Sequence, residues 1–186
     1  DGNVVLNRVS ANFEDGKVNM IIGQSGSGKT VLMKSMIGLH PIDEGEIVFD
    51  TRSGQQNLAR MTEKEVRLLH REVGMLFQGA ALFDSMTVQE NVLYPLEMFS
   101  DMTDEEMVAR ARFCLERVNM PERAFGLMPS EISGGMQKRV AIARAIALNP
   151  KYLFCDEPNS GLDPRTSLVI DQLIQDITRE YNICTI

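Results

Sequence analysis

Apolar and polar residues alternate with two different periods along this chain, and the changes of period predict strands interleaved with helices. Short apolar runs, which are typical of strands in a sheet, occur at residues 17–22, 46–50, 73–77, 152–155 and from 183 onward. Residues 4–13 mix β-branched and polar side chains. Together with the Asp15-Gly16 turn, this segment predicts a hairpin in which residues 4–13 pair with residues 17–22.

Capping patterns mark where helices are expected to begin. Thr62, Thr87 and Thr103 are each followed three residues later by glutamate, which is the capping-box pattern. Further helices are expected at residues 29–37, 134–148 and 164–181, the last with proline in its first turn. Together these elements predict an α/β fold in one domain, residues 1–186, with a mainly parallel core sheet, an antiparallel β edge layer and an inserted α-helical subdomain at about residues 85–149.

The composition is that of a globular protein, with 44% hydrophobic and 24% charged residues. The net charge of -7 argues against a nucleic-acid-binding surface, which needs clustered Lys and Arg, so no nucleic-acid partner is expected. No apolar stretch approaches the roughly 18–20 residues that span a bilayer, and no secretory signal opens the chain. We therefore expect any membrane association to be peripheral and to depend on a partner.

The cysteines and histidines show no metal-site spacing. Cys114, Cys155 and Cys184 lie far apart in the sequence and are expected to be buried, reduced thiols. His40 precedes a proline in a predicted turn and His70 ends a charged helix, so both are interpreted as structural or solvated.

The strongest chemical pattern is the segment Gly23–Thr30, GQSGSGKT, between a predicted strand and a predicted helix. It fits G-x-x-x-x-G-K-[ST], in which glycines let successive backbone amides face phosphate oxygens at a helix N-terminus. Lys29 can reach the β- and γ-phosphates, and the Thr30 hydroxyl can bind Mg²⁺. The alternative is a chance glycine-rich turn, which the strand-loop-helix context disfavours.

Two further patterns place polar groups at the ends of predicted elements. The strand at residues 152–155 ends in Asp156-Glu157, where Asp156 can hold Mg²⁺ and Glu157 can polarise an attacking water. A capping or surface carboxylate is the alternative for Glu157. The segment Ile132–Arg139, ISGGMQKR, opens an Ala/Arg-rich helix whose amides and Ser133 hydroxyl form a second anion site. In a chain with one phosphate loop, such a site is best explained by the nucleotide of another copy.

The order of these motifs is similar to that of the ABC transporter ATPases. The phosphate loop, Gln78 after a strand, the Ser-Gly-Gly signature, the strand ending in Asp-Glu and the SGLD loop at Ser160–Asp163 follow one another over essentially the whole chain. The resemblance implies a P-loop NTPase (ABC ATPase) fold and an enzyme that hydrolyses ATP with Mg²⁺. It also implies a second ATPase copy in a head-to-tail dimer, with each ATP between the phosphate loop of one copy and the signature of the other.

The resemblance also implies a role for each motif residue. Glu157 is the expected catalytic base, with Lys29 and Gln78 as further catalytic residues. The expected Mg²⁺ ligands are Thr30, Gln78 and Asp156. The residues expected to bind ATP are Gly23, Ser25, Gly26, Ser27, Gly28, Lys29, Thr30, Val31 and, across the dimer interface, Ser133, Gly134, Gly135 and Asp163.

Two residues that the family usually carries are not found in this chain. One is an aromatic residue that stacks on adenine, expected before the first residue, and the other is a switch histidine, expected after Ile186. His40 and His70 lie in the wrong places to replace that histidine. Because the chain starts without methionine and ends on an apolar run, we expect it to be trimmed at both ends.

Finer features are similar to the ATP-binding subunit of Mce-associated, Mla-type phospholipid transporters. They are residues 75–83 (MLFQGAALF), residues 91–95 (NVLYP), residues 127–136 (LMPSEISGGM) and Met136 itself, where most ABC signatures have glutamine. This resemblance implies an integral membrane permease and an Mce-domain protein as partners, a phospholipid or another lipid as cargo, and a cytoplasmic location on the inner face of the cell membrane. Some of the following apolar residues are expected to line a permease-docking groove, and the alternative is that most of them fill the core of the helical subdomain: Leu82, Phe83, Met86, Tyr94, Met98 and Phe99.

Other functions make different demands on the sequence. A different ABC importer is the alternative to lipid transport. A soluble ABC ATPase in DNA repair or translation predicts basic patches, tandem cores or long insertions, and none is present. A small-molecule P-loop kinase lacks the signature and the SGLD loop, and a non-hydrolysing ATP-gated clamp does not need Glu157.

Overall fold

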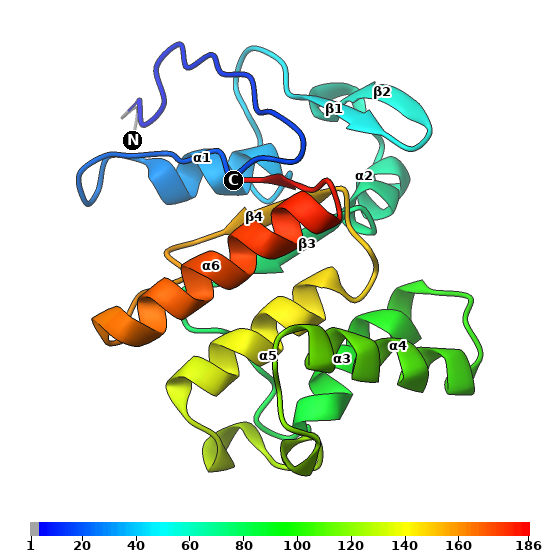
Figure 1. Ribbon diagram of the computed structural model, residues 1–186. Coiled ribbons are helices and arrows are strands. Elements are labelled where there is room, and N and C mark those ends of the chain that lie inside the picture. Colours follow the sequence, from blue (N-terminus) through cyan, green and yellow to red (C-terminus); the bar gives the residue numbers. More distant parts are fainter. Residues whose placement is uncertain (1–3) are drawn as a thin grey trace.

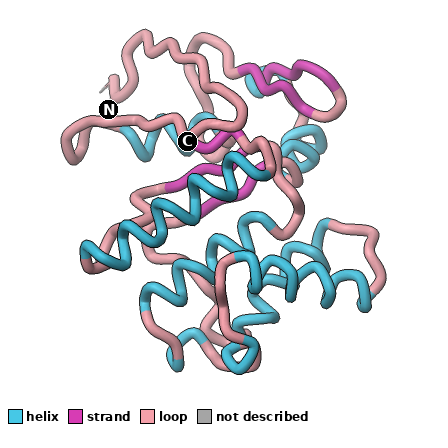
Figure 2. Tube along the Cα trace, viewed as in Figure 1, coloured by secondary structure: helices cyan, strands magenta, loops and turns pink. Residues whose placement is uncertain are grey.

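The core of the protein is a parallel sheet of short strands. In the computed structural model, which describes residues 4–186, β3 (Val73–Leu76), β4 (Tyr152–Cys155) and β5 (Cys184–Thr185) pair in that order. A separate antiparallel pair is formed by β1 (Val48–Thr51) and β2 (Gly54–Asn57), as Figures 1 and 2 show. The predicted α/β class, with a parallel core and an antiparallel layer, is confirmed.

The helices begin where their capping residues predict. The α-helices of the described residues are α1 (Lys29–Met36), α2 (Glu63–His70), α3 (Val88–Phe99), α4 (Asp104–Arg117), α5 (Gly134–Ile146) and α6 (Pro164–Glu180). In α2, α3 and α4 the capping threonine accepts from the amide three residues on, and the glutamate there accepts from the amide of the threonine. Each box satisfies two backbone amides that a helix end would leave free. Between β3 and β4 the chain forms helices and loops only.

The two faces of the parallel sheet pack against different helices. Tyr152 and Phe154 of β4 belong to a cluster with α1, α2 and β1, whereas Leu153 between them belongs to the larger cluster built by α3, α4, α5 and α6. Helix α5 approaches β3 closely at Gly74, where an added Cβ would lie 2.5 Å from the Ala145 carbonyl oxygen. Helices α1 and α5, whose N-termini carry the two predicted anion sites, therefore lie on opposite faces of the sheet (Figure 1).

The strand predictions before α2 are partly wrong. Residues 4–13 form no strand, and residues 17–22 contribute only a bridge from Val18 to Thr185, so the predicted hairpin is not formed. A strand needs a ladder partner, and the partner of residues 17–19 is β5, which is remote in sequence. The strand expected at residues 46–50 begins at Val48 and pairs with β2, whose polar sequence gives no strand signal.

The cysteines and His70 have structural surroundings. The three cysteines are free, and burial raises the pKa of Cys155 to about 12 and those of Cys114 and Cys184 to about 11. The thiols therefore stay protonated near neutral pH. Cys114 and Cys184 are buried as expected, whereas Cys155 is only partly buried. His70 Nε2 lies 2.8 Å from the Ile37 carbonyl oxygen and thus helps to join α2 to the end of α1.

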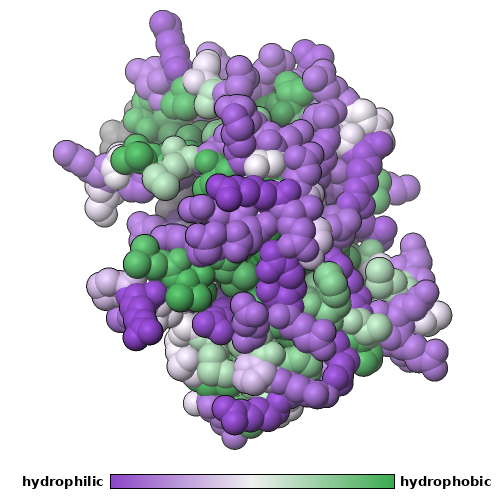
Figure 3. Space-filling model, viewed as in Figure 1, coloured by the Kyte–Doolittle hydropathy of each residue, from purple (hydrophilic) through white to green (hydrophobic). Residues whose placement is uncertain are grey.

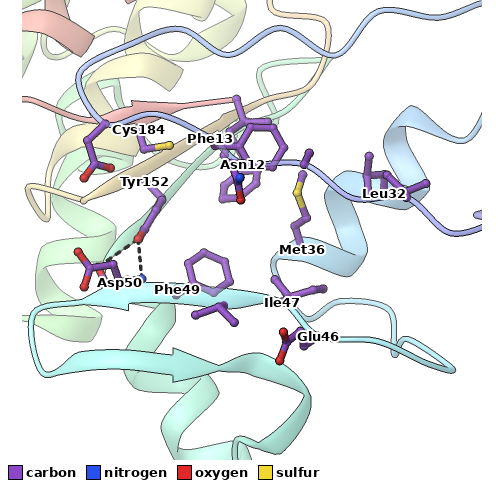
Figure 4. Close-up of a pocket in the computed structure, with 16 residues that line it drawn as sticks. Asn12, Phe13, Leu32, Met36, Glu46, Ile47, Phe49, Asp50, Tyr152 and Cys184 are labelled. Atoms are coloured by element: carbon purple, nitrogen blue, oxygen red, sulfur yellow. Dashed lines mark hydrogen bonds between the residues drawn. The ribbon is translucent and has the colours of Figure 1, made fainter.

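The surface is mixed, and an apolar cavity lies beside the antiparallel strands. None of the helices described here has the length and apolar character needed to cross a bilayer. The face in Figure 3 is mostly hydrophilic, with hydrophobic residues in separate areas. A cavity of about 320 Å³ between β1, α1 and residues 9–15 is lined by Phe13, Met36 and Phe49 among others, with the Tyr152 hydroxyl bonded to the Asp50 backbone beside it (Figure 4). None of the predicted phosphate or Mg²⁺ residues lines this cavity.

Candidate functional site

The glycine-rich loop wraps around the ammonium group of Lys29. Its Nζ donates to the carbonyl oxygens of Gly23 at 2.9 Å and Gln24 at 3.0 Å. Gly26 and Gly28 have φ angles of 79° and 93°, a left-handed conformation that favours glycine and lets the loop turn into α1. The free amides of the first helical turn and the ammonium group are thus brought together, an arrangement that suits phosphate oxygens.

Thr30 and Asp156 join the start of α1 to the carboxyl end of β4. Thr30 Oγ1 lies 3.4 Å from Asp156 Oδ1. A hydroxyl and a carboxylate are hard oxygen donors, and Mg²⁺ in nucleotide sites completes its shell with phosphates and water. No group of three or more His, Cys, Asp or Glu side chains within residues 4–186 is placed to hold a metal ion. The Thr30–Asp156 pair therefore fits a Mg²⁺ ion shared with a nucleotide, and not a cage made by the protein alone.

Gln78 links the end of β3 to the loop that follows β4. Its Nε2 donates to Glu157 Oε2 at 3.0 Å and to Ser160 Oγ at 3.1 Å. The parallel pairing of β3 and β4 brings these segments to one sheet edge, although they are about 80 residues apart. Glu157 has a φ of 46°, which is strained for a residue other than glycine, and such strain clusters at functional sites. Sequence spacing does not reveal Ser160 as a partner of Gln78, although Ser160 opens the SGLD loop.

The signature residues meet the start of α6. Ser133 is the N-cap of α5, and its Oγ accepts from an amide of the first turn at 3.3 Å. An added Cβ on Gly135 would lie 2.8 Å from Thr166 Cγ2, so glycine here permits close packing against α6. Asp163 is the N-cap of α6 and accepts from two amides at 3.0 Å each. Hydrogen bonds from Thr166, chiefly from its hydroxyl, hold the pKa of Asp163 below its usual value.

The predicted site residues therefore form two separate groups. The first group lies at the carboxyl edge of the sheet and contains Gly23–Val31, Gln78, Asp156 and Glu157. The second contains Ser133, Gly134, Gly135 and Asp163. Because α1 and α5 pack on opposite faces of the sheet, the residues of the second group lie apart from the Gly23–Val31 loop of their own chain.

A groove of about 480 Å³ runs beside β3, α3 and α5. Phe83, Tyr94 and Phe99 line it, whereas Leu82 packs against the core of the helical region. The ring centroids of Phe83 and Tyr94 are 4.8 Å apart, and the Arg144 guanidinium lies 5.6 Å from the Phe83 centroid. Met86 and Met98, which belong to the same predicted set, are not part of the lining.

Comparisons with known proteins agree with this geometry. The family model described as ABC transporter matches residues 6–160. The methionine import ATP-binding protein MetN of Clostridioides difficile is 40% identical over 182 residues, which are 98% of this chain and 55% of that protein. The intermembrane phospholipid transport system ATP-binding protein MlaF of Haemophilus influenzae is 36% identical over 183 residues, 98% of this chain and 67% of that one.

The solved structures extend the comparison to the fold. A dimeric post-hydrolysis state of the ATP-binding cassette MJ0796, bound to ADP and Pi, superposes with a TM-score of 0.83 at 34% identity, over 97% of this chain and 77% of that one. The chain spans about half the length of the methionine-import relatives that it matches. The family match, the shared fold and the grouping of the motif residues lead to one conclusion: the chain belongs to the ABC transporter family and has the fold of its ATPase cassettes.

Proposed function

We propose that this chain is the ATP-binding and ATP-hydrolysing domain of a membrane ABC transporter. The observation that carries the proposal is the meeting of Lys29, Thr30 and Asp156 with the Gln78–Glu157 pair at one edge of the parallel sheet. Phosphoryl transfer to water needs positioning and charge stabilisation more than covalent chemistry, and these groups supply both. Residues 85–149 would form its helical subdomain.

Each group in the site has a defined task in this proposal. The loop residues Gly23–Val31 bind the phosphates, and Lys29 adds positive charge beside them. Thr30 and Asp156 hold Mg²⁺, with Gln78 next to them, and the ion when bound neutralises phosphate charge. Glu157, exposed at the end of β4, accepts a proton from the attacking water while Gln78 orients its carboxylate.

A second copy of the chain is the proposed partner for the signature. Ser133, Gly134, Gly135 and Asp163 present two helix N-termini that do not serve the phosphate loop of their own chain. In a head-to-tail dimer they face the nucleotide of the other copy, where their amides stabilise anionic phosphate. The dimeric state of the ADP-bound cassette at 34% identity supports the pairing of two copies.

The test is nucleotide hydrolysis by the full-length protein. Purified protein with ATP and Mg²⁺ is expected to release phosphate, to lose activity when Mg²⁺ is chelated, and to form more dimer with ATP than with ADP. Absence of both ATP binding and phosphate release in the full-length protein would overturn the proposal.

The groove beside β3 is the proposed docking site for a helix of the permease, on the cytoplasmic face of the membrane. Phe83→Asp is expected to release the permease, because a carboxylate cannot be buried in this apolar groove without loss of hydration, and to leave ATP binding unchanged. Co-purification with the permease measures the first effect and nucleotide titration the second. Phe113→Asp, on an exposed aromatic of α4 outside the groove, is the matched control and should retain the permease. Loss of both permease and ATP binding in Phe83→Asp would contradict docking.

The cargo we propose is phospholipid or another lipid. Met136 in the signature and the 36% identity to the phospholipid-transport protein MlaF support it. The 40% identity to the methionine import protein MetN favours a second candidate, import of a small nutrient such as methionine. Affinity purification of the full-length protein from detergent-solubilised membranes separates the two. A permease with an Mce-domain protein and bound phospholipid supports lipid transport, whereas a permease without either favours the second candidate.

A further inference from the structure

We infer that Lys138 is a positioning residue for hydrolysis, which holds the backbone of Gln78 so that the Gln78 amide meets Glu157. The inference rests on the proposed ATPase function and adds a residue to which the motifs assign no role. Its contact joins two parts of the molecule: Lys138 Nζ, on α5, donates to the Gln78 carbonyl oxygen after β3.

The burial of Lys138 is unusual for an ammonium group. The residue is only 4% exposed, and no carboxylate among residues 4–186 forms an ion pair with it. Burial lowers its pKa, which reflects the cost of removing the charge from water. An apolar side chain of similar length would pack there without that cost, so stability does not explain the cation. The hydrogen bond to the Gln78 carbonyl oxygen explains why a charged side chain is buried here.

Gln78 connects Lys138 to the reacting groups. Its carbonyl oxygen accepts from Lys138, and its side-chain amide donates to Glu157 at 3.0 Å and to Ser160 at 3.1 Å. Since the backbone of Gln78 sets the position of its amide, releasing the carbonyl lets the amide leave Glu157. Lys138 thus acts on the carboxylate through Gln78.

A second cation of α5 holds the backbone that follows Gln78. Arg144 donates to the carbonyl oxygens of Ala80 at 2.9 Å and Ala81 at 2.8 Å. These alanines have φ angles of 61° and 49°, in the left-handed region that side chains disfavour, so the segment needs external support. With Arg144 still in place, removal of the Lys138 charge should free Gln78 without unfolding the loop.

The experiment compares Lys138→Met with the wild type in the full-length protein. We expect kcat to fall by about tenfold, as for the loss of one hydrogen bond to a charged group, with KM for ATP changed by less than about twofold. We expect an unchanged or higher Tm, because a buried charge is removed. Without nucleotide, hydrogen exchange at residues 77–84 should become faster. If Lys138 only supported packing, its replacement would lower Tm and would not lower kcat selectively over KM.

Three further variants make the test specific. Arg139→Met removes the neighbouring cation of the same helix, which donates to the Asn119 carbonyl at 3.3 Å, and should keep wild-type kcat. In a Gln78→Ala background, Lys138→Met should cause no further loss of kcat. Lys138→Gln, which keeps a neutral donor, should be intermediate and serves if the methionine variant folds poorly.

Two results would overturn the inference while leaving the ATPase proposal intact. The first is a wild-type kcat in Lys138→Met when Gln78→Ala lowers kcat. The second is a double variant in which Lys138→Met lowers kcat by the same factor as it does alone. Unchanged hydrogen exchange at residues 77–84 would overturn it without reference to activity. A wild-type protein that neither binds nor hydrolyses ATP would instead remove the proposed function on which the inference rests.

Discussion

Replacement of Glu157 by glutamine is expected to lower ATP turnover by about 100- to 10,000-fold, the usual contribution of a general base, while ATP binding is retained. Glutamine keeps the size of the side chain but cannot accept a proton from water. The Glu157 carboxylate lies 3.0 Å from Gln78 Nε2, and the residue follows Asp156, which lies 3.4 Å from Thr30. Phosphate release and equilibrium ATP binding by the full-length protein measure the two effects.

The arrested variant should also accumulate as an ATP-bound dimer. If turnover is blocked after ATP has brought two copies together, size-exclusion chromatography in ATP will show more dimer for Glu157→Gln than for the wild type. Glu116→Gln, an exposed carboxylate of α4, is the control and should match the wild type. Unchanged turnover in Glu157→Gln would mean that the base lies elsewhere. Parallel loss of binding would mean that Glu157 supports the nucleotide site and not the chemistry.

Replacement of Lys29 by alanine is expected to weaken ATP binding by roughly 30- to 150-fold and to abolish measurable turnover. The Lys29 ammonium already lies at the centre of the loop, bonded to the carbonyls of Gly23 and Gln24 at 2.9 and 3.0 Å. Charge-assisted hydrogen bonds to phosphate contribute about 2–3 kcal/mol together, which corresponds to this change in affinity. Titration with ATP and Mg²⁺, at fixed ionic strength, measures the dissociation constant.

Lys34→Ala provides the matched control for Lys29→Ala. Lys34 lies in the last turn of the same helix, away from the loop, and its loss should leave ATP affinity within about twofold of the wild type. Equal weakening in both variants would indicate a general loss of positive charge or of α1 stability. Wild-type affinity in Lys29→Ala would contradict the assignment of Gly23–Thr30 as the phosphate loop.

Local patterns in the sequence were sufficient where the stabilising bonds are local. Thr62 and Glu65 bond to each other across three residues, so the start of α2 follows from the sequence alone. The same holds for the start of α1 after Gly28 and for the strand that ends at Cys155, just before Asp156. The fold class could therefore be predicted, because most of its elements are marked by residues within one turn or one strand.

The pairing of strands could not be predicted in the same way. Residues 17–22 have a strand composition, yet they contribute only the Val18 bridge to Thr185, far along the chain. Strand β2 has a polar sequence. It forms a strand because the chain turns back at Arg52–Ser53 and pairs it with β1. Both outcomes depend on which segment lies alongside, and composition does not specify that.

For this protein, the sequence by itself determined the fold class, the helix starts and the chemical character of each motif. Only the tertiary structure decided which motifs meet: it joined Gln78 to Glu157 and Ser160, put Lys138 against Gln78, and separated Ser133 from the phosphate loop on the opposite face of the sheet. The physical reason is that caps and turns are satisfied by neighbours along the chain. A site is assembled by strand register and helix packing between residues that are distant in sequence.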